Sequence, residues 1–353
     1  MFKKLLEKWY SLISLDMGID LGTANTLVYV RGKGIILNEP SVVAVNQKTG
    51  QVVAVGAQAK QMLGRTQGHI VAAKPIVDGV ISDFEVTEEM LAYLINKAQG
   101  SSRKLLGPRV VIGVPSGITN VEIRAVRDAA KNAGAREVHI VEEPMASAIG
   151  MRLPVHDAVG SMVVDIGGGT ADIAVIALGG VVCSKNVRVA GDKLDRDIIS
   201  YIRSEFKMLI GERTAEAIKM AIGTVIEGVP LEATVRGRDL ATGLPREVTI
   251  TDRHVREAIS QSIDTLIESV KEVIETTPPE ILSDIMKNGL HLAGGGALIK
   301  GLDELLSEWL KIPVYVADEP LTAVARGAGI ILEDLPLYEG LLIQNEDDLS
   351  PQA

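Results

Sequence analysis

Two stretches of this chain repeat one pattern, IDLGTANT at residues 19–26 and VDIGGGT at residues 164–170. Each is an apolar run with an aspartate near its end, followed by a turn that contains glycine and a hydroxyl residue. A second, mostly apolar run then follows, over residues 27–30 in the first copy and 172–176 in the second. Apolar runs separated by a glycine-containing turn predict a β-hairpin, here with an acidic side chain at its tip.

The chemistry of these two tips suits a nucleotide triphosphate. Glycine lets the backbone approach an anion closely, and consecutive N–H groups in such a turn form an anion-binding nest. Asp20 and Asp165 can hold the Mg²⁺ that accompanies the phosphates, because this ion prefers oxygen ligands. One such turn alone is more often only a tight hairpin. Two of them, facing each other, would clamp phosphates between two related domains.

A third glycine run, AGGGA at residues 293–297, follows the apolar stretch of residues 290–292. Three such elements in this order resemble the superfamily of actin, Hsp70 and the sugar kinases. The resemblance implies that they are a first phosphate loop, a second phosphate loop and an adenosine loop. It also implies an α/β fold of the actin-like, RNase H-like duplicated type, with two lobes of four subdomains around a nucleotide cleft.

The composition is typical of an ordered globular protein with two domains. Of the 353 residues 46% are hydrophobic, 23% are charged and only 3% are aromatic, so the cores must be aliphatic. A net charge of −10 without lysine and arginine clusters argues against nucleic acid as a partner. The single Cys183 excludes an internal disulfide and fits a reducing cytoplasm, and the five histidines lack zinc-binding spacing. No apolar stretch is long enough to span a bilayer, and no secretory signal is visible.

The first 14 residues predict a short amphipathic helix. Six large apolar residues recur at helical spacing, and the charged residues, mostly lysines, take the other face. Such a helix suits the surface of an anionic membrane, and the alternative is that it packs on its own domain. An apolar pair in the polar loop of residues 100–108 is a second candidate insertion point, although a solitary exposed pair often has no function. The predicted membrane residues are Phe2, Leu5, Leu6, Trp9, Leu12, Ile13, Leu105 and Leu106.

Elsewhere strand and helix patterns alternate, as an α/β fold requires. A strand over residues 110–115, a helix opened by a capping box of Thr119 with Glu122, and a strand over residues 138–141 predict a βαβ unit, with Gly134 closing the helix. Further helices are predicted at about residues 87–98, 193–209, 214–222, 252–275, 302–310 and 321–332, and further strands over residues 42–45, 52–55 and 314–316.

The stretch Glu142-Glu143-Pro144 follows one of these strands directly. Ligands of α/β folds gather at the carboxyl ends of strands, and the proline restricts Glu143 to an extended conformation that would aim its carboxylate into the cleft. In the superfamily the residue before this proline orients or deprotonates the attacking water, so Glu143 is the predicted general base. The alternative is that both glutamates are solvated at a helix start. Thr170 is a second candidate for positioning water, or its hydroxyl only caps the turn.

The chain resembles one family over most of its length. DLGTANTLVYVRGKGIILNEPSVVAV, VVIGVPSGITNVE, VEEPMASAIG, MVVDIGGGTADIAV, IGERTAEAIK, LAGGGALIKGLDELL and PLTAVARGAG are similar to the MreB family, the bacterial actins that shape rod cells. One departure is Ala171-Asp172, where the family pattern is Thr-Glu. The resemblance implies that Asp20 and Asp165 hold Mg²⁺ mostly through water. The nucleotide ligands that it implies are Thr23, Ala24 and Asn25 in the first phosphate loop, Gly167, Gly168, Gly169 and Thr170 in the second, Gly191, Asp192, Glu216 and Lys219 at the ribose and adenine, and Gly294, Gly295, Gly296 and Ala297 at the adenosine and phosphates.

The function implied by this resemblance is that of an ATPase, with ATP and Mg²⁺ as cofactors, which polymerises into membrane-associated filaments. These would organise cell-wall synthesis and determine rod cell shape. The expected partners are further copies of the chain in paired protofilaments, the inner face of the cytoplasmic membrane, and membrane-bound cell-wall morphogenesis proteins. Nucleic acid is not expected. The expected location is cytoplasmic, peripheral on the inner face of the cell membrane.

Two other classes share the phosphate loops: a soluble ATPase of the actin and Hsp70 superfamily, and a sugar-kinase-like phosphotransferase. An Hsp70 chaperone would need a β-rich domain after the third glycine run, and a sugar kinase uses an aspartate base aimed at a hydroxyl. Neither class explains the amphipathic N-terminus. The expected organisation is a membrane helix over residues 1–14, lobe I over 15–150 with a smaller subdomain at about 39–83, lobe II over 151–340 with a smaller subdomain at about 191–252, and an acidic flexible tail over 341–353.

Overall fold

The computed structural model describes residues 15–65, 68–100 and 106–343. The predicted N-terminal helix and Leu105 of the predicted insertion loop lie outside these residues, as does the chain after Ile343. Within them the chain folds into strands and helices in alternation, so the prediction of an α/β fold is confirmed.

In the described part of the chain, two five-stranded sheets share one topology, as a duplicated fold requires. The first sheet has the order β10-β9-β1-β2-β3, and the second has the order β13-β12-β11-β17-β18. In each, the central strand pairs antiparallel with its hairpin partner on one side and parallel with a later strand on the other. The strands are β1 Met17–Leu21, β2 Asn25–Val30, β3 Gly34–Pro40, β9 Arg109–Val114 and β10 Glu137–Glu142 in the first sheet, and β11 Ser161–Ile166, β12 Ala171–Ala177, β13 Gly180–Val187, β17 Leu290–Ala293 and β18 Val314–Val316 in the second.

The two predicted hairpins form the centres of these sheets, β1 with β2 and β11 with β12. Asp20 lies opposite Leu27 across the first hairpin, whereas Asp165 lies opposite Asp172 across the second. Each aspartate is also level with the last paired residue of the neighbouring parallel strand, β9 or β17. The hairpin prediction is therefore confirmed, and each acid stands at the edge where the parallel strands end.

Helices cover both sheets. The capping box predicted at the start of α4 is present, because the Thr119 hydroxyl accepts the Glu122 N–H and the Glu122 carboxylate accepts the Thr119 N–H. The helices are α2 Ala57–Met62, α3 Phe84–Gln99, α4 Asn120–Asn132, α5 Glu143–Gly150, α6 Gly191–Glu205, α7 Glu212–Ile222, α8 Asp252–Thr276, α9 Pro279–Asn288, α10 Leu302–Leu310, α11 Ala323–Glu333 and α12 Leu335–Tyr338, with 3₁₀ turns at Gly295–Leu298, Pro320–Thr322 and Glu339–Leu341.

Two predicted helix boundaries are wrong. α3 begins at Phe84, three residues early, because the Asp83 carboxylate caps it by accepting the Val86 N–H at 3.1 Å. α6 ends at Glu205 and does not continue to residue 209. Lys207 takes a left-handed φ of 51°, which breaks the helix, and the next two residues pair as the short strand β14 Met208–Leu209.

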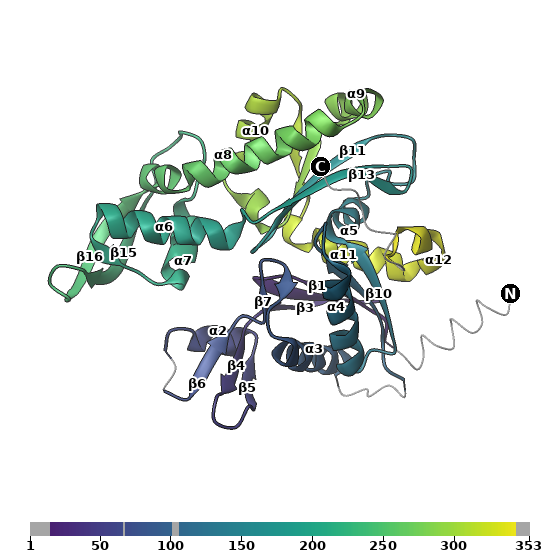
Figure 1. Ribbon diagram of the computed structural model, residues 1–353. Helices are drawn as coiled ribbons and strands as arrows, with labels where there is room; N and C mark the ends of the chain where they lie inside the picture. Colours follow the sequence, from purple (N-terminus) through teal and green to yellow (C-terminus); the bar gives the residue numbers. More distant parts are fainter. Residues whose placement is uncertain (1–14, 66–67, 101–105, 344–353) are drawn as a thin grey trace.

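Smaller sheets extend from the large ones (Figure 1). One has the order β5-β4-β6, with α2 beside it, and another has the order β14-β15-β16. Both fall within the ranges 39–83 and 191–252 that the sequence analysis assigned to the smaller subdomains, and Figure 1 shows both on the side away from α12. The division into four subdomains stays a prediction. The strands are β4 Val43–Asn46, β5 Val52–Val55, β6 Ile70–Ala73, β15 Glu232–Asp239 and β16 Pro245–Thr251, and the short hairpin β7 Ile76–Val77 with β8 Val80–Ile81 lies between β6 and α3 in the chain.

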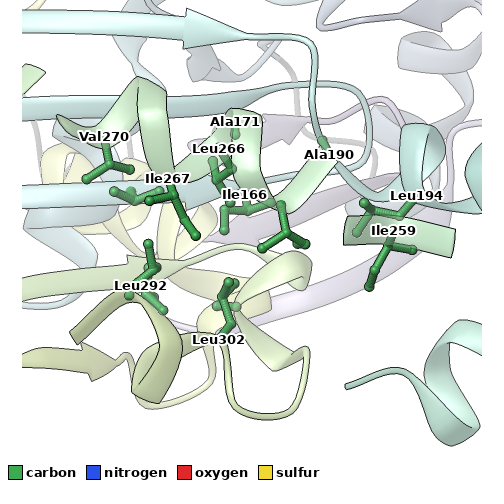
Figure 2. Packing of buried hydrophobic residues seen from close by; sticks show 14 of the residues in the cluster. Ile166, Ala171, Ala190, Leu194, Ile259, Leu266, Ile267, Val270, Leu292 and Leu302 are labelled. Carbon is green, nitrogen blue, oxygen red and sulfur yellow. The ribbon is translucent and has the colours of Figure 1, made fainter. Parts of the chain in front are cut away.

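Aliphatic side chains fill the cores of both lobes, as the scarcity of aromatic residues predicts. In lobe I, Ile19, Leu91 and Ile112 are fully buried together. In lobe II the strands β11, β12 and β17 pack against α6, α8 and α10 (Figure 2). The labelled side chains of this second core include Ile166, Leu194, Ile259, Leu266, Leu292 and Leu302.

The crossing of α5 and α11 joins the two lobes, and these helices lie between the large sheets in Figure 1. A side chain at Gly150 would run into the backbone of Ala323, and one at Gly327 would run into the carbonyl of Ala146. Small residues therefore let the two helices touch backbone to backbone. This explains the alanine- and glycine-rich sequence of α11 and fixes how the lobes approach each other.

The packed chain extends to the last described residue. Leu342 and Ile343 are buried, and the Ile343 N–H donates to the carbonyl of Ile140 in β10 at 2.9 Å. Our prediction that a flexible tail starts at residue 341 is therefore wrong, since a tail can begin no earlier than residue 344.

Among the described helices, none combines the length and the apolar character that crossing a bilayer would require.

Candidate functional site

A cavity of about 420 Å³ opens between the lobes and is lined from both hairpin turns. Its size lies in the range of small-molecule sites. The structure brings together along it every residue that the sequence analysis assigned to catalysis, to the nucleotide or to Mg²⁺, with one exception. Ala297 is only 3% exposed and packs in the core of lobe II.

The two hairpin turns nearly touch. A Cβ atom added to Gly168 would lie 2.6 Å from the Cβ of Ala24, and one added to Gly169 would lie 2.6 Å from the Thr23 hydroxyl. Such distances exclude any side chain at these positions, so the glycines are required for the tips to face each other. This leaves the backbone of both turns lining one cavity, where an anion can be held from two sides.

Acidic groups gather at the floor of this cavity. Burial, and then the charge of Asp165, raises the pKa of Asp20 to about 8. Burial raises the pKa of Asp165 to about 6, although the Ser147 hydroxyl donates to its carboxylate and opposes the shift. Asp165 lies near the end of β11 and is only 6% exposed. Its carboxylate lies against Ser147 of α5, and a Cβ atom added to Gly294 would lie 2.5 Å from its Oδ1 atom.

Glu143 is the first residue of α5 and points its carboxyl group toward these acids. Burial raises its pKa well above the ordinary value, and the charges of Asp172, Asp20 and Asp165 raise it further. Its neighbour Glu142 is the N-cap residue of α5 and is only 4% exposed. The alternative that both glutamates are solvated is therefore wrong.

Thr170 ends the second turn and is 6% exposed. The backbone closes this turn, because the Gly167 N–H donates to the Thr170 carbonyl at 2.9 Å. The turn therefore does not need the threonine hydroxyl as its cap, and this leaves the hydroxyl available to the cavity.

The α6 end of the cavity is tied to the second turn. The Gly191 and Asp192 N–H groups donate to the carbonyls of Gly167 and Gly168 at 3.1 and 2.8 Å. Lys219 of α7 completes this corner, because its ammonium donates to the Gly191 carbonyl at 2.8 Å and pairs with Asp195 at 2.9 Å.

Two acidic residues of this end face the opposite lobe. Glu216 pairs with Lys60 of α2 at 2.9 Å, and Asp192 pairs with Lys74 at 2.9 Å. Lys60 and Lys74 belong to lobe I, so both ion pairs cross the mouth of the cavity.

Comparison with known proteins decides the family. The family model described as MreB/Mbl protein matches residues 14–339. The chain belongs to the MreB/Mbl family. Its match covers both hairpins, the third glycine run and nearly all described residues.

Relatives in the family are about half identical to this chain. The cell shape-determining protein MreB of Escherichia coli strain K12 is 51% identical over 347 residues, which cover 97% of this chain and 100% of that protein. The cell shape-determining protein Mbl of Bacillus subtilis strain 168 is 49% identical over 327 residues, which cover 92% of this chain and 97% of that protein.

Solved structures of MreB-like proteins share the fold. The crystal structure of MreB5 of Spiroplasma citri bound to ADP has a TM-score of 0.87 and 37% identity, and covers 91% of this chain and 97% of that chain. The same protein bound to AMPPNP gives a TM-score of 0.87. The MamK double helical filament has a TM-score of 0.79 and 25% identity, and covers 92% of this chain and 100% of that chain. The actin-like fold is thereby established for this MreB/Mbl family member.

The tip of the β7–β8 hairpin belongs to the site but was not predicted from the sequence. Asp78 and Gly79 both have positive φ, and the Gly79 N–H donates to the Thr23 hydroxyl at 3.0 Å, so this tip touches the first turn. An Asp-Gly dipeptide between apolar residues is a strong hairpin signal that could have revealed the turn, although not its place. Three apolar side chains that line the cavity were not predicted either: Met220 in α7, and Leu298 and Leu321 in the 3₁₀ turns Gly295–Leu298 and Pro320–Thr322.

Proposed function

We propose that the protein is a cell shape-determining, actin-like ATPase that assembles into filaments on the cytoplasmic face of the membrane. The observation that carries this proposal is the pair of duplicated hairpin turns that face each other across one cavity. Binding of ADP and AMPPNP by MreB5 of Spiroplasma citri, at a TM-score of 0.87, supports a nucleotide as the occupant. The MamK double helical filament supports assembly into paired protofilaments.

In this proposal the phosphates of ATP lie between the two turns. Backbone N–H groups of Thr23, Ala24 and Asn25 bind them from lobe I, and those of residues 168–170 bind them from lobe II, because the Gly167 N–H already donates to the Thr170 carbonyl. The nucleoside extends toward Gly191, Asp192, Glu216 and Lys219, with residues 294–296 beside it. The apolar side chains of Met220, Leu298 and Leu321 offer surface for the base.

Asp20 and Asp165 fit the Mg²⁺ that the proposal requires. Both are carboxylates in one cavity whose charged forms are unfavourable in the protein alone, and a divalent cation reverses that preference. No group of three or more potential ligand side chains occurs among the residues that the structure describes, so phosphate and water oxygens would complete the shell. When bound, the ion neutralises charge that develops on the transferred phosphoryl group.

Glu143 is the general base for the attacking water in this proposal, and Thr170 helps to orient that water. A base works best when its pKa approaches the operating pH, and burial among acids shifts Glu143 in that direction. A glutamate base at this position suits water as the attacking group, which favours hydrolysis over sugar phosphorylation.

The described residues next to the two predicted membrane segments lie at one end of the first sheet. β1 runs parallel to β9, so their first residues Met17 and Arg109 stand at the same end of the sheet. The Arg109 guanidinium donates to the buried Asp16 carboxylate at 2.8 Å, which ties the starts of the two strands together. Residues 1–14 precede one start, and the loop with Leu105 and the half-buried Leu106 precedes the other.

This shared edge supports attachment to the membrane. Each lysine near anionic lipid contributes about 1 kcal/mol, so a single chain would bind weakly and a filament would bind through many copies. Membrane-bound cell-wall morphogenesis proteins are the proposed partners there.

Electron microscopy of the full chain with Mg·ATP and anionic lipid vesicles tests the proposal. We expect paired filaments lying on the vesicles. A variant lacking residues 2–13 is the matched control and should form filaments in solution that leave the vesicles bare. Absence of filaments under all nucleotide conditions would contradict the proposal, and phosphate transfer to a sugar would favour the kinase alternative.

A further inference from the structure

Asp172 is a buried carboxylate that is not among the residues proposed to bind the nucleotide or Mg²⁺. It lies in β12 and is 1% exposed. Its Oδ1 atom accepts the Ser116 N–H at 2.7 Å and the Asn186 side-chain amide at 2.9 Å. Ser116 lies between β9 and α4 in lobe I, whereas Asn186 lies in β13 of lobe II. Asp172 therefore accepts a hydrogen bond that joins the lobes, close to Glu143 but outside the lining of the cavity.

Stability alone does not explain this residue. A carboxylate taken out of water is unfavourable unless it is well compensated, and Ser116 and Asn186 offer it neutral N–H groups. Its cross-strand partner is another acid, Asp165, and burial raises the pKa of Asp172 to about 7. An apolar residue in this strand would avoid the whole cost.

The bond from Ser116 connects the elements that carry the proposed hydrolytic groups. On the lobe I side, Ser116 follows β9, whose last residue Val114 pairs with Glu142 directly before Glu143. On the lobe II side, Asp172 stands two residues after Thr170 in the same hairpin. A link between Ser116 and Asp172 therefore relates the position of Glu143 to that of Thr170.

We propose that Asp172 is a positioning residue for ATP hydrolysis. Its carboxylate holds the Ser116 backbone of lobe I against β12 of lobe II, and so sets the relative placement of Glu143 and Thr170. This inference rests on the proposed ATPase function. Because Asp172 is not proposed to contact the nucleotide, ATP affinity should not depend on this residue.

Three variants separate this role from a general structural one. Asp172→Ala removes the acceptor, Asp172→Asn keeps an oxygen in the same place without the charge, and Asn186→Ala removes only the partner within lobe II. We expect Asp172→Ala to hydrolyse bound ATP at least tenfold more slowly in single-turnover experiments, with ATP affinity within threefold of the parent. Asp172→Asn and Asn186→Ala should stay within threefold of the parent in both measurements.

A distance measurement tests the link without requiring hydrolysis. Spin labels at the exposed positions Lys48 and Thr234, on a Cys183→Ser background, report the separation of the lobes. We expect the distance distribution with Mg·AMPPNP to broaden in Asp172→Ala and to keep the parental width in Asp172→Asn.

Several outcomes would overturn the inference. Parental hydrolysis in Asp172→Ala would do so, as would an equal loss in Asp172→Asn, because the charge and not the bond would then matter. An unchanged distance distribution in Asp172→Ala would remove the link between the lobes. A parent that binds ATP without hydrolysing it would refute the proposed ATPase instead, while the distance measurement would still decide whether Asp172 joins the lobes.

Discussion

The floor and the mouth of the cavity hold the lobes together in different ways. Around the floor, Asp165 and Asp172 are buried beside Glu143, and each of these acids has a raised pKa. At the mouth, the Lys60–Glu216 and Lys74–Asp192 pairs have side chains that are 27% to 35% exposed. Charges buried together act strongly on each other, whereas exposed ion pairs contribute little, typically about 0–1 kcal/mol. The reacting groups at the floor are therefore held in place, whereas the ion pairs at the mouth can separate at a small cost in free energy.

The largest expected effect comes from the base at the floor. Glu143→Ala should lower the rate of phosphate release about 10²–10⁴-fold, the usual contribution of a general base, while ATP affinity stays close to that of the parent. A malachite-green assay beside calorimetry measures both. Glu137→Ala, at the other end of β10, is the matched control and should hydrolyse normally. If Glu143→Ala lost binding instead of turnover, Glu143 would be structural.

A smaller effect is expected for the proposed metal ligand. Asp165→Asn keeps an acceptor for the Ser147 hydroxyl, so the fold should survive, but it removes the charge that would attract Mg²⁺. We expect ATP affinity measured with Mg²⁺ to fall about 10- to 100-fold, the range seen when metal-site groups are altered. Affinity without Mg²⁺ should barely change. Equal losses with and without the ion would place Asp165 outside the metal site.

The floor also makes stability depend on pH. Asp20 and Asp172 have raised pKa values of about 8 and about 7, so the folded protein binds more protons than the unfolded chain and loses stability as pH rises through these values. Each proton released accounts for at most about 1.4 kcal/mol per pH unit. His139 and His291 have lowered pKa values because of burial and act in the opposite sense, but only below about pH 6.5.

Thermal unfolding of the nucleotide-free protein between pH 7 and 8.5 in chelator measures this dependence. The melting temperature should fall with rising pH, and Mg·ADP should flatten the curve. Asp172→Asn should reduce the slope. A rising melting temperature over the same range would contradict the assignment of buried acids to the floor.

The mouth should give the smallest effect. Lys60→Ala removes one partly exposed ion pair, whereas Lys74→Ala removes the pair with Asp192 and a second pair with Glu212 at 3.7 Å. Release of a fluorescent ATP analogue should accelerate only about two- to fivefold in Lys60→Ala, in line with an energy below about 1 kcal/mol, and somewhat more in Lys74→Ala. High salt should accelerate release from the parent as the substitution does, and it should change the release rate of the variants little. Lys48→Ala, which replaces an exposed lysine of the same lobe, is the control. If stopped-flow fluorescence showed release that was faster by two orders of magnitude, the ion pairs at the mouth would be part of the binding site itself.

The residues around the floor of the cavity could largely be predicted from local sequence patterns. The two aspartate-glycine turns, the third glycine run and Glu143 before Pro144 each lie within a few consecutive residues, so spacing alone indicates them. The structure then places these residues around one cavity. The left-handed turn at Lys207 was not predictable, because a lysine carries no signal for positive φ.

The contacts that join the lobes could not be read from the sequence. Ser116 and Asp172 are far apart in the chain, and their hydrogen bond exists only because α5 and α11 bring the lobes together. The same holds for Lys60 with Glu216. The β7–β8 tip carried a turn signal, but its contact with Thr23 depends on the tertiary fold.

The central claim is that the two hairpin turns clamp the phosphates between them. Calorimetric titration of Mg·ATP into the parent and Gly168→Ala tests it most directly, because the added methyl group would lie 2.6 Å from the Cβ of Ala24 and must push the turns apart. We predict at least a tenfold loss of affinity with an unchanged circular dichroism spectrum. Parental affinity in a folded Gly168→Ala variant would contradict the claim.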